Sequence, residues 1–307
     1  MSQYKTLHIE RSEFYRLGTK KDLAKLLGFS ISQLKNLSKD DNYRPWTKIG
    51  KNGKSRIIEE PLPDLARLQQ RAYKLLRKVE TPIWLMSGKR GIKPQDNAIA
   101  HADGAYIINV DIQSFFQSTK REFVYRCFQK DFEIRDDVAS VMADLLTYES
   151  HIPTGTATSQ LMAFWAYRRT FERIHSLCKS QGIAMTLWVD DITFSREKPF
   201  PRGWVRTLSR IFRSVDLNLK STKTKRYGPR QFKIVTGSAI TPAGELRVRN
   251  AKRREILLML GSRRVEDLSL GETRSVLGRI TSQRQNEPEF FDDMFRRCRD
   301  RVKKLSG

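Results

Sequence analysis

The sequence is poor in cysteine: it has only Cys127, Cys178 and Cys298, and these lie far apart. Their number is odd and no C-x-x-C pair occurs, so the sequence supports neither a disulfide framework nor a zinc ribbon. We therefore expect three ordinary buried thiols.

The sequence also lacks a long apolar run, a lipidation signal and an amphipathic anchor. These absences disfavour a basic protein of the membrane surface, and we read no signal peptide, which predicts a cytoplasmic protein. Repeats and low-complexity segments are missing as well. With 307 residues, 39% of them hydrophobic, the chain is long enough to bury a core in one large domain or two closely packed ones.

Acidic residues are few: the sequence has 34 Asp and Glu against 58 Lys and Arg, which gives a formal net charge of +24. The basic residues run through the whole chain and are not confined to one tail. A folded surface with such a positive field is suited to phosphate polymers. The charge therefore predicts a nucleic-acid partner.

Two short helical runs lie near the N-terminus, at residues 22–27 and 32–37, with Gly28, Phe29 and Ser30 between them. The pair resembles a small helix-turn-helix, which in a DNA-binding protein reads the major groove. Two amphipathic helices around a glycine also occur in many other folds. We favour plain packing over groove reading.

A basic hairpin is predicted next. Residues 46–49 and 56–59 are β-prone and flank residues 51–54 (Lys-Asn-Gly-Lys), in which Asn-Gly suits the positive φ angles of a tight turn. Residues 63–79 carry apolar side chains at three-to-four-residue spacing. This spacing predicts a helix that packs beneath the hairpin.

The rest of the chain mixes short strands with helices, which predicts an α+β fold with a small antiparallel sheet. The expected strands are residues 105–111, 183–189, 192–195 and 232–240, and the expected helices are residues 121–130, 136–147, 158–180 and 204–215, followed by a basic helical remainder.

Three aspartates stand out. Asp111 ends one apolar strand, and Asp190 and Asp191 lie in the turn between two others, so adjacent pairing of these strands would bring three carboxylates together. Phosphoryl transfer needs charge neutralisation, and a pair of Mg²⁺ ions held by carboxylate oxygens supplies it. The alternative is that Asp190 and Asp191 form a solvated β-turn.

Residues 109–116 (Asn-Val-Asp-Ile-Gln-Ser-Phe-Phe) and residues 188–191 (Trp-Val-Asp-Asp) resemble motifs A and C of reverse transcriptases. Residues 97–101 (Asn-Ala-Ile-Ala-His) match the N-A-x-x-H element and residues 235–237 (Val-Thr-Gly) the V-T-G element that mark retron reverse transcriptases. The ordered set carries the resemblance, which covers roughly residues 46–240. Outside this range, the two ends of the chain resemble the family only in general character and carry none of its motifs.

The resemblance implies a catalytic site. Asp111 and Asp190 would be direct metal ligands, Asp191 a supporting carboxylate, and the carbonyl of Ile112 a ligand of the nucleotide-bound ion, with two Mg²⁺ in all. Lys223 matches the lysine of motif D that is proposed to protonate or stabilise the departing pyrophosphate. A solvated surface lysine is the alternative.

The resemblance also implies a nucleotide site. Phe116 would lie under the sugar and select deoxynucleotides, although adjacent Phe115 and Phe116 also fit core packing. Lys54 and Arg56 resemble residues that hold the triphosphate, and the guanidinium suits phosphate better.

Two positions depart from the family pattern. In the motif B segment, residues 153–160, Thr154 stands where glutamine is usual, while Gly155 and Ser159 are kept, so the nucleotide contact at Thr154 is in doubt. Trp188 replaces the usual tyrosine of motif C, which keeps an aromatic face and removes a hydroxyl.

Residues for RNA are expected in the marker elements and near the C-terminus. His101 either buttresses the fold or contacts RNA directly. Basic runs on helices are often solvated faces, and Asp292, Asp293 and Asp300 offer partners, but the net excess favours backbone binding. The expected RNA-binding residues are Asn97, His101, Val235, Thr236, Gly237, Arg247, Arg249, Arg253 and Arg254.

The resemblance implies a right-hand polymerase, with an N-terminal helical extension at residues 1–45, fingers and palm at 46–240, and a helical thumb at 241–307. Such an enzyme uses deoxynucleoside triphosphates to copy part of a cognate structured noncoding RNA into multicopy single-stranded DNA (msDNA). Synthesis is primed from a 2′-hydroxyl of an internal guanosine. The family also implies an antiphage system with an effector protein encoded nearby.

Two other functions stay open. One is another bacterial reverse transcriptase, of the group II intron or diversity-generating type, although we see no appended maturase or endonuclease region. The other is a non-catalytic RNA-binding scaffold of the same fold, which the irregular motif B favours and the intact aspartates disfavour. The sequence does not identify the RNA, the guanosine, the effector or the oligomeric state.

Overall fold

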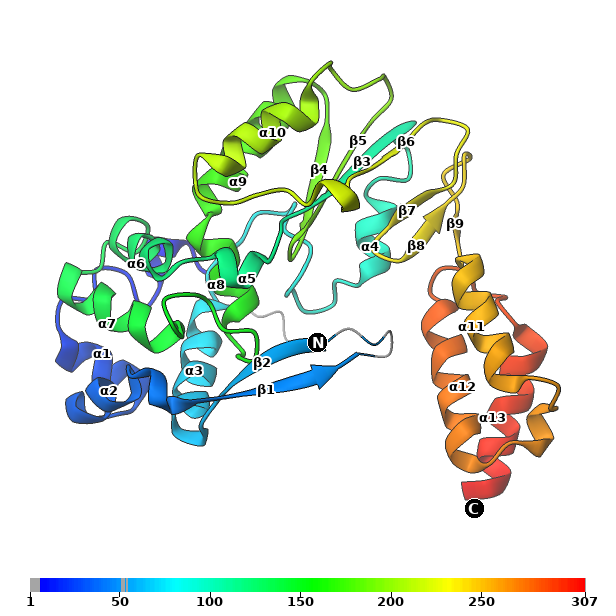
Figure 1. The fold of residues 1–307 in the computed structure, drawn as a ribbon, viewed down its shortest axis with the longest axis horizontal. Coiled ribbons are helices and arrows are strands. Elements are labelled where there is room, and N and C mark those ends of the chain that lie inside the picture. Colours follow the sequence, from blue (N-terminus) through cyan, green and yellow to red (C-terminus); the bar gives the residue numbers. More distant parts are fainter. Residues whose placement is uncertain (1–5, 51–52, 54, 307) are drawn as a thin grey trace.

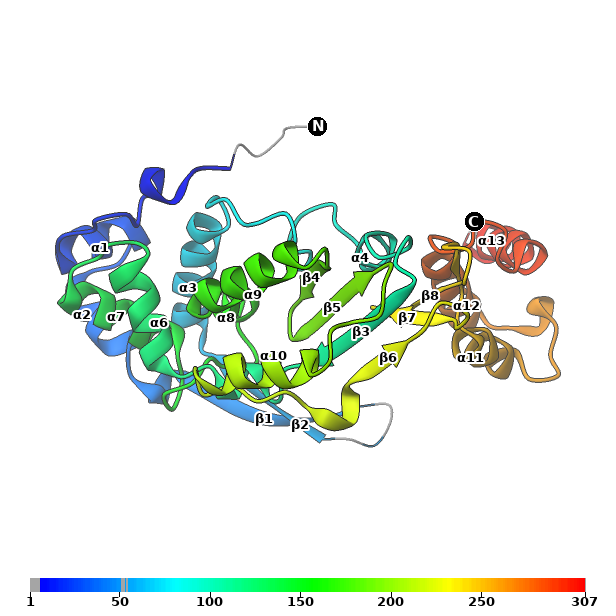
Figure 2. The ribbon, with the colours of Figure 1, turned by 90° about the horizontal axis from the view of Figure 1, so that it is seen from above.

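The computed structural model describes residues 6–50, 53 and 55–306, and in them it has three antiparallel sheets among helices (Figure 1). The predicted α+β class is confirmed. Helices α1 and α2 lie at one end of the molecule and helices α11–α13 at the other (Figure 2). Cys127, Cys178 and Cys298 are free and buried, as expected. None of the described helices is long and apolar enough to cross a membrane.

The two N-terminal helices are fixed by their caps. Helix α1 (Lys20–Leu27) begins at Thr19, whose hydroxyl accepts from the Asp22 amide, and ends at Gly28 with φ 80°. Helix α2 (Ile31–Leu37) begins with a capping box of Ser30 and Gln33. Both helices bury their leucines against the same core as α3 and α7. This placement agrees with plain packing.

The predicted hairpin is formed by β1 (Tyr43–Ile49) and β2 (Ser55–Pro61), paired from Tyr43 with Pro61 to Ile49 with Ser55. Helix α3 (Pro63–Leu76) follows it and buries an apolar stripe. Most side chains of β1 are exposed, so the hairpin projects from the core. Lys54 and most of the basic tip lie outside the described residues.

The four-stranded sheet, which we call the palm sheet after the palm that the resemblance predicts, has the order β4-β5-β3-β6. The central strands β3 (Tyr106–Asp111) and β5 (Asp191–Arg196) pair Asp111 with Asp191, and β4 (Ala184–Trp188) flanks β5. The edge strand β6 (Lys225–Tyr227) is short and charged. Its pairing with β3 was not predicted, because three polar residues carry no strand pattern of their own.

Side chains alternate along β3, so the palm sheet has two different faces. Ile108 and Val110 join the main core with residues of α9 (Arg168–Ser180) and α10 (Trp204–Arg213). Ile107 joins a smaller cluster with Ala98, Val235 and Ile240 on the other face. That face is covered by α4 (Pro94–Ile99), β7 (Lys233–Val235) and β8 (Ser238–Ile240) (Figure 1).

The predicted helix 158–180 is two helices, α8 (Ser159–Ala166) and α9, which meet at Tyr167. The backbone of Tyr167 leaves the helical region, with φ −116° and ψ 16°. Its buried ring packs on Phe115 and Phe123, and its hydroxyl donates to the Ser118 carbonyl. Tertiary packing of this ring thus interrupts a helical pattern that is continuous in the sequence. The other helices of this region are α5 (Phe115–Ser118), α6 (Arg121–Lys130) and α7 (Asp136–Leu146).

The C-terminal bundle consists of α11 (Asn250–Leu260), α12 (Leu270–Gln283) and α13 (Asp292–Ser306). It has a hydrophobic cluster of its own, which includes Ile256, Val276, Ile280, Phe290 and Cys298. The two-residue strand β9 (Leu246–Arg247) pairs with β8 and leads into the bundle. Short 3-10 turns complete the described elements at Ile9–Arg11, Asp40–Asn42, Ser221–Lys223 and Val265–Asp267.

Candidate active site

The three predicted carboxylates converge at one end of the palm sheet. Asp111, Asp190 and Asp191 each offer an oxygen, and these oxygens lie within 4.8 Å of one another. The register places Asp111 opposite Asp191, and the Ile112 amide donates to the Asp190 carbonyl at 2.9 Å. The predicted convergence of the three carboxylates is confirmed.

The turn that carries Asp190 is strained. Val189 has φ 58°, a left-handed conformation that a β-branched residue rarely adopts and that costs about 1–3 kcal/mol. Its amide donates to the buried hydroxyl of Ser87 at 2.9 Å, which helps to hold the turn. No local pattern indicated a role for Ser87, because the contact joins residues about a hundred positions apart.

The site favours a cation. Burial, followed by the charge of Asp111, raises the pKa of Asp190. Burial and then the charges of Asp190 and Asp111 raise the pKa of Asp191 to about 6. Three convergent carboxylate oxygens, two of them from groups with a raised pKa, are a donor set that a hard divalent cation stabilises. The residues therefore fit a metal-dependent reaction.

Lys223 lies at this site. Its ammonium group donates to an Asp111 oxygen, and the Lys220 amide donates to the Asp111 carbonyl at 2.8 Å. The hydrogen bond to Asp111 raises the pKa of Lys223. About half of the Lys223 side chain is exposed. Lys223 is thus an exposed lysine that is held against a catalytic candidate.

Phe115 and Phe116 have different surroundings. Phe115 is buried and packs against Tyr167 and Phe171, which is the core role expected for one of the two rings. Phe116 is only partly buried, with its ring 6.2 Å from that of Phe115. Phe116 therefore stays available to a sugar, and its role as a gate stays a prediction.

The motif B loop is fastened to the hairpin through Glu59. The buried carboxylate of Glu59 accepts from the Thr154 amide at 2.9 Å and contacts His151 Nε2 at 2.9 Å. The Thr154 hydroxyl donates to the Ile57 carbonyl at 2.9 Å. A Cβ on Gly155 would lie 2.5 Å from the Glu59 carbonyl oxygen, so only glycine fits there. In this structure Thr154 holds the motif B loop against β2, and its hydroxyl is already engaged in a hydrogen bond.

Arg56 is exposed on β2, opposite Lys48. It lies close enough to the site for its charge to lower the pKa of Asp190, although this is the smallest of the effects on that group. Trp188, the residue before the strained turn, is cross-strand from Asp191. Both positions agree with roles beside an incoming nucleotide and a primer end, which stay predictions.

The two marker elements contact each other. The buried amide of Asn97 donates to the Thr236 hydroxyl at 3.4 Å, and that hydroxyl donates to the Pro94 carbonyl. His101 is 1% exposed, and its ring nitrogens lie 2.7 Å from the hydroxyls of Ser195 and Thr186. This placement favours the buttressing role of His101 over direct contact with RNA. Val235 is also buried, whereas Gly237 is exposed.

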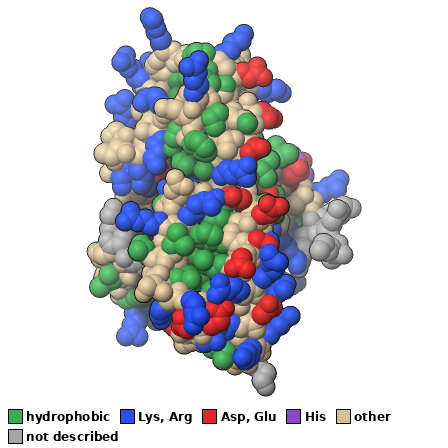
Figure 3. All heavy atoms as spheres, turned by 90° about the vertical axis from the view of Figure 1, so that its right-hand side faces the viewer, with side chains coloured by type: hydrophobic (Ala, Val, Ile, Leu, Met, Phe, Trp, Pro, Cys, Tyr) green, Lys and Arg blue, Asp and Glu red, His purple; other side chains and the backbone are tan. Residues whose placement is uncertain are grey.

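The arginines of the C-terminal bundle are largely paired. One Nη of Arg253 donates to both carboxylate oxygens of Glu287, and Arg297 forms a bidentate pair with Glu266. Figure 3 shows Asp and Glu side chains interspersed with Lys and Arg over this end of the molecule. Arg247 pairs with Glu245, but among the described residues Arg249 and Arg254 form no carboxylate pair.

A basic groove that the sequence did not reveal adjoins the site. It has a volume of about 1030 Å³ and begins at Ser87 and Gly88, next to the strained turn. Gln160 of α8 lies on one side, and Lys74 and Lys89 also line it. Basic residues at helical spacing in α3, such as Arg71 and Lys74, are indistinguishable in sequence from a solvated face.

An α+β chain with three convergent aspartates at the end of an antiparallel palm sheet has the site of a metal-dependent nucleotidyl-transferring polymerase. No known family model matches the chain. The retron Ec86 reverse transcriptase of Escherichia coli is 27% identical over 226 residues, which cover 72% of this chain and 70% of that protein.

The retron Se72 reverse transcriptase of Salmonella heidelberg is 28% identical over 49% of this chain and 40% of its own length. The retron Ec48 reverse transcriptase of Escherichia coli is 25% identical over 67% of this chain and 55% of its own. The chain thus spans about half the length of these two relatives. A foamy viral protease-reverse transcriptase, solved with double-stranded DNA, aligns with 79% of this chain and 36% of its own, at TM-score 0.43 and 16% identity.

The chain is homologous to the retron reverse transcriptases, and its enzyme class by that homology is RNA-directed DNA polymerase.

Proposed function

We propose that this protein is a retron reverse transcriptase that copies part of a cognate structured noncoding RNA into msDNA. Synthesis starts from the 2′-hydroxyl of an internal guanosine, and the product stays branched from the RNA. The observation that carries the proposal is the carboxylate cluster of Asp111, Asp190 and Asp191 in a chain homologous to retron enzymes. The contact between Asn97 and Thr236, one from each marker element, supports it.

Two Mg²⁺ ions are the cofactor that we propose. Asp111 and Asp190 hold them, Asp191 supports the site, and the carbonyl of Ile112 contributes to the nucleotide-bound ion. When bound, the pair of ions neutralises charge on the attacking and leaving oxygens. The convergent oxygens support this assignment.

The remaining roles concern the nucleotide. Arg56, with Lys54 outside the described residues, holds the triphosphate of the incoming deoxynucleotide. Phe116 excludes a 2′-hydroxyl from beneath the sugar, and the loop at Thr154 and Gly155 shapes the pocket beside it. Lys223, whose proton is held firmly by Asp111, stabilises or protonates the departing pyrophosphate.

The RNA occupies the basic surfaces. We assign the template to the groove at Ser87 and Lys89, and the duplex to the helical thumb at residues 241–307, where Arg249 and Arg254 have no carboxylate partner among the described residues. Residues 46–240 form fingers and palm, and residues 1–45 are an extension. The separate hydrophobic cluster of the bundle supports the last boundary. Of the marker-element residues that we expect to bind RNA, Gly237 is exposed and contacts it directly, whereas the buried Asn97 and Val235 hold the two elements in place.

The cellular setting follows from the same proposal. The protein acts in the cytoplasm, with its RNA–DNA product, as part of an antiphage system that restrains an effector protein encoded nearby. The homology to five retron enzymes supports the retron assignment. Infection of cells that carry the intact locus or an Asp190→Asn locus tests the defence role. Equal phage yields would contradict it.

DNA synthesis by the purified protein on its neighbouring noncoding RNA, with Mg²⁺ and deoxynucleotides, tests the central proposal. Wild-type protein should give a product that stays attached to RNA until debranching, and Asp190→Asn should give none. Tight RNA binding without any wild-type product would favour the non-catalytic scaffold. A product without a branch would favour another class of bacterial reverse transcriptase.

A further inference from the structure

A second pocket opens far from the carboxylates. It has a volume of about 630 Å³ and lies between α10 and the palm sheet. Tyr106, which lines it, begins β3, and Asp111 ends that strand. Five residues of strand separate the two by roughly 16 Å. Tyr106 and Ile108 also point to the face that α10 covers, whereas Asp111 points to the other face.

The rim of this pocket is basic. Arg206 and Arg213 are exposed on one side of α10, and Arg226 is exposed on the edge strand β6, cross-strand from Ile108. No Asp or Glu lines the pocket, and within the described part of the chain none of these arginines pairs with a carboxylate. This differs from the C-terminal bundle, where the arginines are mostly neutralised.

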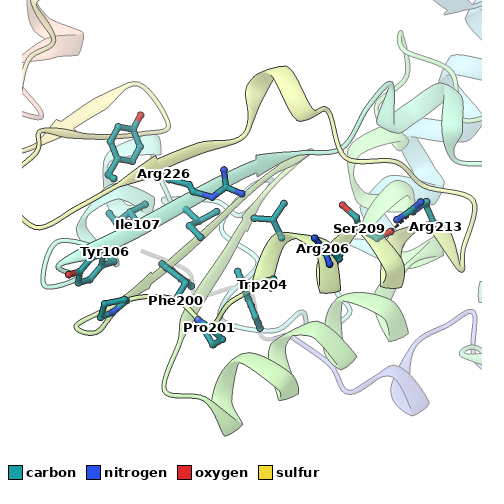
Figure 4. A pocket seen from close by; sticks show the side chains of 14 residues that line it. Tyr106, Ile107, Phe200, Pro201, Trp204, Arg206, Ser209, Arg213 and Arg226 are labelled. Carbon is teal, nitrogen blue, oxygen red and sulfur yellow. Dashed lines mark hydrogen bonds between the residues drawn. The ribbon is translucent and has the colours of Figure 1, made fainter.

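The wall of the pocket is aromatic. Tyr106, Phe200 and Tyr227 are partly exposed, and Phe200 packs against the buried ring of Trp204 with centroids 6.4 Å apart. Figure 4 shows Tyr106, Phe200 and Arg226 gathered near the strands, with Arg206 and Arg213 following along α10. The volume falls within the range of about 300–1,000 Å³ typical of small-molecule sites.

We propose that this pocket binds an unpaired nucleotide of a single-stranded nucleic acid, with the base against the aromatic wall and the flanking phosphates on Arg206 and Arg226. Stacking on aromatic rings is worth about 1–3 kcal/mol per base and tolerates any base. The guanidinium fork matches phosphate oxygens. Because no acid lines the pocket, its charge is complementary to phosphate and not to a basic ligand.

Such a site has a consequence for the enzyme. A nucleotide held in the pocket lies on the α10 face, roughly 16 Å along β3 from Asp111, and so is not itself at the carboxylates. The pocket would therefore anchor an unpaired stretch of RNA or product DNA without entering the reaction. This role is independent of the msDNA assignment and of catalysis.

Binding of fluorescein-labelled U12 and dT12, with the cleft occupied by a primer–template duplex, tests the proposal. Arg206→Ala with Arg226→Ala should weaken binding by about ten-fold or more, because two charged phosphate contacts are lost. Arg202→Ala with Arg210→Ala is the matched control, since it removes two exposed charges near or on α10 that do not line the pocket. The control should change binding less than two-fold.

Phe200→Leu adds a test that does not alter charge, because it keeps apolar bulk and removes the aromatic face; it should weaken U12 binding several-fold. Photocrosslinks from 4-thiouridine in U12 should map to Tyr106, Phe200 or Tyr227. Extension of oligo(dT) on poly(rA) should be unchanged in all of these variants, which separates this proposal from the catalytic one.

Comparison of U12 with dT12 and uridine monophosphate identifies the source of the nucleotide, and tight binding of the monophosphate alone would overturn the anchoring role. Equal weakening by both double variants would overturn the pocket in favour of general charge attraction. Unchanged U12 binding in every variant would overturn it too, and would leave this surface to an acidic protein partner.

Discussion

At the residue scale, the carboxylates and His101 show how burial shifts the pKa of a titratable side chain. Asp111 is buried and paired with Lys223. At the strained turn, burial and then the charge of Asp111 raise the pKa of Asp190, and burial and then the charges of Asp190 and Asp111 raise the pKa of Asp191. His101 is enclosed between two hydroxyls and stays neutral, because burial lowers its pKa to about 4. Catalytic and structural groups thus share one strand, since Asp191 begins β5 and the Ser195 that contacts His101 lies four residues further along it.

Asp190→Asn with Asp191→Asn should abolish DNA synthesis and leave RNA affinity within about two-fold, since only cation binding is removed. The same variant should unfold at a higher temperature than wild type in EDTA. Removal of the repulsion should stabilise the fold by about 1 kcal/mol after allowance for solvent screening. Thermal unfolding and filter binding measure both effects. A lower unfolding temperature with lost RNA binding would indicate misfolding and contradict this account.

The stability of the fold should depend on pH through His101. Its folded pKa of about 4 lies below the unfolded value of about 6.5, so the unfolded chain binds the proton more readily. This contribution is fully present above pH 6.5 and is lost as the pH falls toward 4, by about 3 kcal/mol. Urea unfolding at pH 7, 5.5 and 4 measures it. His101→Gln should flatten the slope, whereas the control His175→Gln retains His101; equal slopes would refute the assignment.

At the scale of elements, the active site is assembled by contacts between segments distant in sequence. Strand β2 binds the motif B loop through Glu59, and the hydroxyl of Ser87 holds the turn of Asp190. Helix α4 is joined to the turn between β7 and β8 through Asn97 and Thr236. The hairpin that carries Arg56 is therefore coupled to the loop that shapes the nucleotide pocket. A change at either should affect the other.

Gly155→Ala should disrupt this coupling, because the new Cβ meets the Glu59 backbone at 2.5 Å. We expect a loss of about 1–3 kcal/mol in the free energy of unfolding, or a displaced loop with a several-fold higher KM for deoxynucleotides. The control Gly278→Ala lies in α12 with nothing within 4 Å and should be neutral or slightly stabilising. Wild-type stability and KM in Gly155→Ala would show that the loop is free of the hairpin.

At the scale of the whole molecule, the net charge of +24 is unevenly neutralised. Salt bridges absorb much of the bundle's basic charge, while Arg254 on α11 stays exposed beside Leu257 and Leu258, two exposed apolar side chains. The arginines around the pocket on α10 are likewise exposed and, among the described residues, have no carboxylate partner. The surfaces left with excess positive charge are the ones we assign to nucleic acid.

RNA binding should weaken steeply with salt, and Arg254→Ala should lower the slope of log K against log salt by about one. The control Arg296→Ala removes an arginine already paired with Asp292 at 3.0 Å and should change the slope little. Titration of labelled RNA duplex from 50 to 300 mM salt measures both variants. Equal slopes for Arg254→Ala and wild type would remove α11 from the RNA interface.

The sequence by itself determined the features that repeat locally: the strands around Asp111 and Asp190, the helices α1–α3 and the basic surface. Alternation and helical spacing are properties of neighbouring residues, so they are legible without a fold. The order of the motifs predicted that the three carboxylates lie together, and their distances in the structure confirm this prediction.

Only the tertiary structure decided which side chains are free to act. It buries His101 between two hydroxyls and engages the Thr154 hydroxyl in a hydrogen bond. It pairs Arg253 and Arg297 with carboxylates. It also ends one helix at Tyr167 and adds the edge strand β6, which carries Arg226. Each of these outcomes depends on a partner far away in sequence, whose distance and burial no local pattern encodes. Exposure and pairing are properties of the packed molecule, and they separate residues of the same type into structural and functional ones.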